Sequence, residues 1–232
     1  MNTWKKKPVT LIVADSGPLI SLSLADRLEL LQTFGRPVLI VDTVQMECTK
    51  KAHAPGRERL ADWLNTTGKN QFELIKTPFA SLYEDALTLE MSGEDKRATQ
   101  GLGDATISWL VKNLDRTAGR DGKTPVGSNN DIVLILTEDG PFGDGHVSNK
   151  REAHILSTRE WLAALENLKI IASADQILKE IEAAGRTVSK YRADRPAIID
   201  PNVQVRSDGD LEGGDIAVAV MRVGHEKLLI IT

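Results

Sequence analysis

Residues 9–24 read V-T-L-I-V-A-D-S-G-P-L-I-S-L-S-L, an apolar run that meets an aspartate and then continues into a second apolar segment. The unbroken apolar and β-branched pattern of residues 9–14 is typical of a strand buried on both faces of a parallel sheet. Residues 18–24 are predicted to form a helix. Asp15 therefore marks a turn from strand to helix, which indicates an α/β fold.

The same alternation continues along the chain. Buried strands are predicted at 38–41, 72–75 and 132–136, and helices at 26–34, 56–65, 80–91, 105–114, 157–168 and 173–184. Residues 115–131 are polar and contain several glycines, as expected of an exposed loop. Strands that alternate with helices predict a mainly parallel sheet with right-handed crossovers.

Three further acidic residues stand near strand-to-helix junctions: Glu47 in V-Q-M-E, Asp104 in G-L-G-D-A, and Asp139 in T-E-D-G-P-F. In parallel sheets the functional crevice lies beyond the carboxyl ends of the strands, so we expect these side chains and Asp15 to gather there. Two carboxylates about 4 Å apart repel by roughly 4 kcal/mol at an effective dielectric constant of ~20. A cluster of four therefore calls for divalent metal, shared protons, or both.

Each acidic residue also has a simpler interpretation. Asp15 and Asp104 fit helix caps, and Glu47 fits an exposed helical position. Asp139 stands beside Gly140 and suits a turn, which leaves Glu138 or Asp144 as alternatives for the fourth functional carboxylate. The joint placement carries the hypothesis, together with neighbouring hydroxyl donors at Ser16 and Thr137. Another acidic residue, Asp42, is predicted to cap the helix that contains Glu47, with Gln45 at the capping-box position.

Carboxylate oxygens are the ligands that Mg²⁺ and Mn²⁺ prefer, and such ions activate water and polarise a phosphate. Other kinds of site find less support. The sequence Gly122-Lys123-Thr124 lacks the earlier glycine of a phosphate-binding loop, and Gly101-Leu102-Gly103 lacks the third glycine of a dinucleotide fingerprint. The four histidines show no zinc-ligand spacing, and no nucleophile elbow is present.

Composition limits the class of protein. The chain has 232 residues, a formal net charge of −4 and 41% hydrophobic residues, which is enough for one ordinary domain and a tail. Its single cysteine, Cys48, excludes an internal disulfide, and no segment has the length of a membrane span, so a cytoplasmic location is predicted. Basic residues near Lys50 and Lys150 are interpreted as solvated surface or as contacts to a nucleic-acid backbone.

Taken in order, the four motifs resemble those of the PIN-domain ribonucleases, in particular the VapC-like toxins of bacterial toxin–antitoxin systems. The resemblance covers roughly residues 9–186. It implies a PIN-like three-layer α/β/α sandwich and Mg²⁺- or Mn²⁺-dependent cleavage of RNA, held in check by an antitoxin protein. It also implies catalytic and metal-binding roles for Asp15, Glu47, Asp104 and Asp139, supported by Ser16, Thr137 and Asp144.

We therefore expect a nuclease domain at 1–190 and a C-terminal extension at 191–232. The extension is rich in Asp, Arg, Pro and Gly before two possible strands at 216–223 and 228–231. A β-hairpin, a swapped arm of a homodimer and a partner-binding element all fit this pattern. Two other functions remain open from the sequence: a non-catalytic PIN-like scaffold and a structure-specific DNA nuclease.

Overall fold

A computed structural model describes residues 9–36, 38–50, 56–64, 72–119, 121–128, 130–138 and 153–188, together with strands at 218–223 and 226–231. Its centre is a sheet of parallel strands in the order β3-β2-β1-β4-β5. The strands are β1 (Leu11–Ala14), β2 (Val38–Val41), β3 (Phe72–Ile75), β4 (Val133–Leu136) and β5 (Ala153–Leu156).

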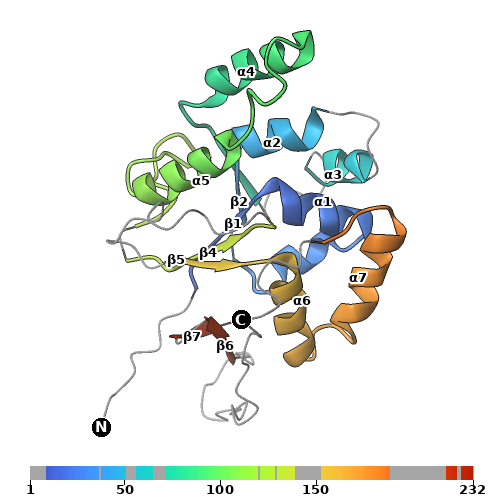
Figure 1. Cartoon of the computed structure of the whole chain (residues 1–232). Coiled ribbons are helices and arrows are strands. Elements are labelled where there is room, and N and C mark those ends of the chain that lie inside the picture. The colour runs from blue at the N-terminus through green and yellow to red at the C-terminus, as the bar shows by residue number, and fades with distance from the viewer. Residues whose placement is uncertain are drawn as a thin grey trace.

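Helices cover both sides of this sheet, with α2 and α5 on one side and α6 and α7 on the other (Figure 1). The helices are α1 (Ser16–Leu24), η1 (Leu28–Gln32), α2 (Asp42–Thr49), α3 (Arg57–Asp62), α4 (Ala80–Ser92), α5 (Leu102–Asn113), α6 (Thr158–Asn167) and α7 (Ala174–Ala183). This arrangement confirms the predicted three-layer α/β/α sandwich with a parallel central sheet. No helix in the described part of the chain is long and apolar enough to cross a membrane.

The strand order places a topological switch point between β1 and β4. From β1 the chain builds outward through β2 to β3, and it then returns to add β4 on the other side of β1. The register pairs Ala14 with Leu136, and the Asp15 amide donates to the Leu136 carbonyl at 2.9 Å. Because crossovers leave in opposite directions at such a point, a crevice opens beyond the strand ends, where Asp15 lies.

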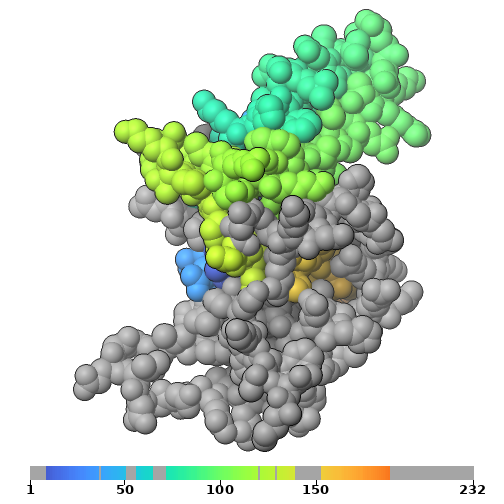
Figure 2. Space-filling view, turned by 90° about the vertical axis from the view of Figure 1, so that its left-hand side faces the viewer, coloured from blue at the N-terminus to red at the C-terminus, as the bar shows by residue number. Residues whose placement is uncertain are grey.

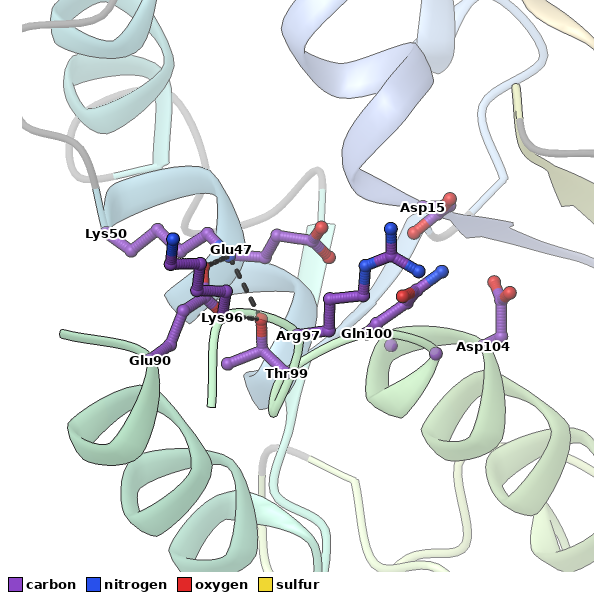
Figure 3. A pocket seen from close by; sticks show the side chains of 11 residues that line it. Asp15, Glu47, Lys50, Glu90, Lys96, Arg97, Thr99, Gln100 and Asp104 are labelled. Carbon is purple, nitrogen blue, oxygen red and sulfur yellow. Dashed lines mark hydrogen bonds and ion pairs between the residues drawn. The ribbon is translucent and has the colours of Figure 1, made fainter. Parts of the chain in front are cut away.

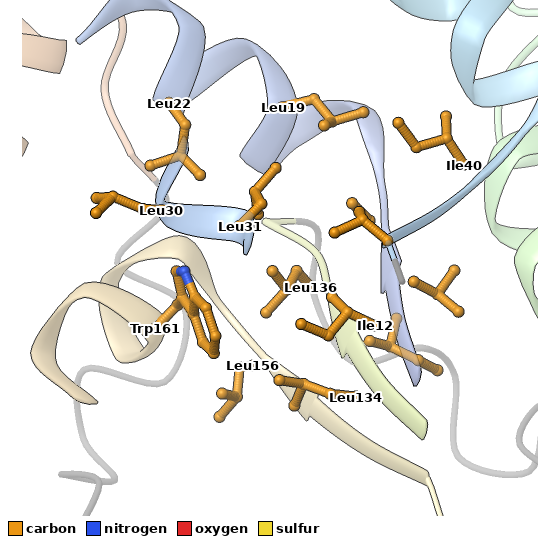
Figure 4. Close-up of a cluster of buried hydrophobic side chains, with 14 of the residues drawn as sticks. Ile12, Leu19, Leu22, Leu30, Leu31, Ile40, Leu134, Leu136, Leu156 and Trp161 are labelled. Carbon is orange, nitrogen blue, oxygen red and sulfur yellow. The ribbon is translucent and has the colours of Figure 1, made fainter. Parts of the chain in front are cut away.

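The core that holds this edge is continuous from the sheet into α6 (Figure 4). Ile12 and Leu134 are almost completely buried, and the indole of Trp161 on α6 is fully buried. Trp161 meets Phe34 edge to face, with ring centroids 5.3 Å apart. Each large apolar side chain buried in this way contributes about 1.5–3 kcal/mol. The strand ends that carry the functional residues are therefore set on a rigid base.

Two parts of the secondary structure differ from the prediction. The segment predicted as a helix at 26–34 is the short 3-10 helix η1, preceded by Asp26 with a positive φ of 57°. Strand β5 was not predicted, because its sequence is only A-H-I-L and its side chains are alternately half-buried and buried. That burial pattern fits a strand at the edge of a sheet, which has a neighbour on one side only.

Two predicted helix caps are wrong. Helix α2 begins at Asp42 itself, whose carboxylate accepts hydrogen bonds from Thr43 N at 2.9 Å and from Thr77 N and Oγ1, both at 2.7 Å. Helix α5 begins at Leu102, with Gly101 at the cap position in a left-handed conformation at φ 77°. Asp104 lies in the first turn of α5, where the helix dipole favours a carboxylate.

Near the C-terminus, β6 (Val218–Val223) and β7 (Glu226–Ile231) form a separate antiparallel pair. These strands overlap the two segments that the sequence predicted. The role of the extension stays a prediction.

A buried carboxylate ties the end of β4 to three distant segments. Glu138 is 6% exposed and accepts hydrogen bonds from Ser21 Oγ of α1 at 2.5 Å and Thr158 Oγ1 of α6 at 2.7 Å. Arg186, which follows α7, binds its other oxygen through Nη2 at 2.9 Å, and Arg186 Nε also donates to Ser21 Oγ at 2.9 Å. Both carboxylate oxygens are thus used within the fold, so we infer that Glu138 anchors the structure.

We predict that Glu138→Ala lowers the free energy of unfolding by about 2–3 kcal/mol, because it leaves a cation and two buried hydroxyls without their acceptor. We expect a loss of stability near the lower end of this range, because 31% of the Arg186 side chain remains exposed to solvent. Urea denaturation measures the change, with Glu182→Ala on the exposed face of α7 as control. A double-mutant cycle with Arg186→Met should show coupling, and independent effects would contradict the anchor.

Candidate active site

Asp15 is a buried carboxylate at the switch point of the sheet. It is 3% exposed, and its side chain caps α1 by accepting a hydrogen bond from Ser16 N at 2.7 Å. Its second oxygen accepts a hydrogen bond from Thr137 Oγ1 at 3.1 Å, across the junction of β1 and β4. These two donors hold the carboxylate in one orientation. Ser16 acts here through its backbone amide, and Thr137 through the hydroxyl that the sequence singled out.

Glu47 reaches the same place from α2, and a glycine of α5 lets it do so. A Cβ atom added to Gly103 would lie 3.2 Å from Glu47 Oε2 and 3.9 Å from Asp15 Oδ1. The distance between Glu47 Oε2 and Asp15 Oδ1 therefore cannot exceed the sum of these two distances. Gly103 is buried inside α5 and has no positive φ. The close approach of side chains, not the backbone conformation, is what favours glycine here.

Asp15, Glu47 and Asp104 line one pocket of about 300 Å³ (Figure 3). Its other charged walls come from the ends of α2 and α4 and from the loop between α4 and α5. The remaining lining residues are Lys50, Glu90, Lys96, Arg97, Thr99, Gln100, Gly101 and Gly103. The structure thus gathers three of the four predicted carboxylates, whereas Asp139 and Asp144 lie outside the described residues.

The electrostatics next to the pocket reflect these carboxylates. Burial raises the pKa of the Cys48 thiol, and the negative charges of Asp15 and Glu47 raise that pKa further. The pKa of Tyr83 is raised by burial first and then by Glu47 and Glu90. The negative potential that disfavours the thiolate of Cys48 and the phenolate of Tyr83 also favours the binding of cations in the pocket.

The donor set fits a hard divalent cation held partly through water. Within the described ranges, no group of three or more His, Cys, Asp or Glu side chains is placed to hold one metal ion together. Mg²⁺ does not need such a cage, because it keeps several waters and is commonly bound through one or two carboxylates. Asp15 and Glu47 supply such a pair, and Asp104 stands on the same pocket.

The cationic wall of the pocket, formed by Lys96 and Arg97, was not predicted from the sequence. Lys96 and Arg97 both line it from the loop between α4 and α5, and both are exposed. Their local sequence, E-D-K-R, resembles any solvated charged turn, and no pattern ties it to the acidic motifs. Only the fold brings this loop to the carboxylates.

An acidic pocket thus lies at the switch point of a parallel α/β/α sandwich. A family model described as DUF3368, PIN domain, matches residues 11–89, from β1 into α4, and thus includes Asp15 and Glu47. Over these residues the chain is similar to the PIN-domain family, whose members are generally nucleases. No curated protein and no solved structure matches the chain.

We predict that Gly103→Ala weakens Mn²⁺ binding roughly tenfold, because the new methyl group crowds Glu47 away from Asp15. The thermal midpoint should change little, since Gly103 lies in the first turn of α5 and has no positive φ that alanine would strain. Calorimetric titration and thermal unfolding test the two effects separately. In a Glu47→Gln background, Gly103→Ala should reduce the Mn²⁺ affinity little further. A further tenfold loss of affinity in that background would show that the methyl group does not act through Glu47.

Proposed function

We propose that the chain is a Mg²⁺- or Mn²⁺-dependent endoribonuclease that hydrolyses phosphodiester bonds of RNA. The observation that carries the proposal is the convergence of Asp15, Glu47 and Asp104 on one pocket at the switch point. The PIN-domain match over residues 11–89 supports the same class of activity. Asp139, directly after Glu138, is proposed as the fourth carboxylate, with Asp144 as a supporting residue.

In this proposal Asp15 and Glu47 would hold a divalent cation, which when bound would supply a Lewis acid for the scissile phosphate and for the attacking water. Asp15 holds its ligand position rigidly, because Ser16 N and Thr137 Oγ1 fix both of its oxygens. Glu47, on the neighbouring helix, orients the water and accepts its proton. The water oxygen bonds to phosphorus, the bond from phosphorus to the leaving sugar oxygen breaks, and that oxygen takes a proton from solvent. Asp104 completes the negative side of the pocket.

We further propose that the enzyme is a toxin-like component of the cytoplasm, controlled by a cognate antitoxin protein and able to dimerise. The order of the four sequence motifs supports this role. Growth arrest on expression of the wild-type chain, relieved by Asp15→Asn, is the expected result. Unimpaired growth at comparable expression would count against toxicity while leaving the nuclease chemistry intact.

Asp15→Asn and Asp104→Asn are predicted to lower cleavage of a mixed RNA pool by about 100-fold or more and to weaken Mn²⁺ binding together with it. The fold should survive in Asp15→Asn, because asparagine caps a helix as well as aspartate. Calorimetry with Mn²⁺ and gel analysis of the RNA measure both effects.

The matched control for this test is Asp85→Asn, which removes an exposed carboxylate from α4. It should leave binding and cleavage unchanged. Cleavage retained in the purified Asp15→Asn and Asp104→Asn proteins would refute the assignment. A DNA pool of the same sequences is run in parallel, and preferential cleavage of DNA would move the substrate class from RNA to DNA.

A further inference from the structure

We propose that Arg97 binds a backbone phosphate of the nucleic-acid substrate, opposite the carboxylates of the pocket. This inference rests on the proposed nuclease function and adds a substrate contact to it. The side chain belongs to the loop between α4 and α5. In Figure 3 its guanidinium points into the pocket between the carboxylates of Glu47 and Asp15.

A cation is needed at this place for a simple electrostatic reason. The substrate carries one negative charge per nucleotide, and four carboxylates line the pocket: Asp15, Glu47, Glu90 and Asp104. A bound metal ion can offset the carboxylates, but the phosphates flanking the reaction centre still face an acidic wall. Guanidinium is well suited to the task, because its planar donors match two phosphate oxygens at once.

The other cations of the pocket are less suited. Lys50 is already engaged, since its Nζ lies 3.6 Å from Glu90 Oε1 and donates to Thr99 Oγ1 at 3.2 Å. Lys96 carries a point charge and lacks the fork of the guanidinium. No ion pair joins the Arg97 side chain to a carboxylate in the part of the chain that the structure describes.

The loop holds Arg97 in place. Its backbone amide donates to the carboxylate of Asp95 at 2.9 Å, and the Ala98 amide donates to the Asp95 carbonyl at 3.4 Å. Gly93 ends α4 in a left-handed conformation at φ 81°, so the chain can turn back toward α5. Arg97 therefore sits in a closed turn, which lowers the entropic cost of binding a phosphate.

A second contact fastens this loop to α2. Thr99 is 9% exposed, and its hydroxyl donates to Glu90 at the end of α4, beside Lys50. The hydrogen bond from Thr99 is the main cause that lowers the pKa of Glu90, which favours the charged carboxylate that Lys50 contacts. Helix α4 itself projects from the rest of the molecule (Figures 1 and 2), so its loop depends on this contact to stay over the pocket.

The test measures binding of a fluorescent single-stranded RNA by anisotropy, in an Asp15→Asn background that prevents cleavage. Adding Arg97→Ala should weaken binding roughly 10- to 100-fold, as expected for one charge-assisted contact. The slope of log affinity against log salt should fall in magnitude by about 0.7, the value for one phosphate of a single strand. Arg97→Lys should give an intermediate loss, and Thr99→Val a loss of about fivefold.

Arg116→Ala is the matched control, because Arg116 is an exposed arginine just beyond α5 that does not line the pocket. It should bind as tightly as the parent. An RNA affinity unchanged by Arg97→Ala would overturn the inference. If the same variant also bound Mn²⁺ more tightly, Arg97 would be identified as a counterion of the carboxylates. The parallel experiment with DNA of the same sequence shows whether the contact reads the phosphate in both polymers.

Failure of this inference and failure of the proposed function remain distinguishable. Wild-type protein without RNA cleavage, or Asp15→Asn with full cleavage, counts against the nuclease assignment whatever Arg97 does. In an active enzyme, Arg97→Ala should raise KM and leave kcat within about threefold if the contact binds the ground state and the transition state alike. A normal KM in that variant would also overturn the inference.

Discussion

The pairing of β1 with β4 is the constraint on which the site depends. The register sets Ala14 against Leu136, so Asp15 and Thr137 must leave the sheet side by side. A carboxylate as buried as Asp15 is costly unless donors satisfy it, and the Thr137 hydroxyl together with Ser16 N meets that need. A shift of one residue in this pairing would turn Thr137 to the opposite face and remove the contact. Sheet register and carboxylate geometry are thus one property of the chain.

The two kinds of charge in the pocket are supported in different ways. Asp15, Glu47 and Asp104 come from the end of β1 and from helices α2 and α5, which pack on the core. Lys96 and Arg97 come from a loop that is held by short-range turns and by the contact of Thr99 with Glu90 and Lys50. In the proposed nuclease, rigid elements suit the groups that would hold a metal ion in a fixed geometry. A fastened loop suits groups that meet a polymer, since the phosphates of successive substrates arrive in slightly different positions.

Much of the fold could be predicted because local sequence patterns identify most of its strands and helices. Strands β2 and β3 have the bounds that were predicted, and β4 differs by one residue, since continuous apolar runs identify buried parallel strands. Strand β5 gave no such signal, because it is short and lies at the edge. Of the site, Asp15, Glu47 and Asp104 stood out by their junction positions. The cationic wall could not be found this way, because only tertiary structure brings residues 96 and 97 to residue 15.

The structural role of Glu138 could not be predicted from local sequence either. Its contacts distinguish two uses of carboxylates in this chain. Glu138 and Asp42 are each surrounded by donors from distant segments, so their charges hold elements together. Glu47 and Asp104 instead line a pocket together with Asp15. Sequence cannot tell these uses apart, since donors such as Ser21 and Arg186 lie 117 and 48 residues from Glu138. Carboxylates gathered around a pocket are the arrangement that the proposed cation site requires, because each negative charge there favours a bound cation.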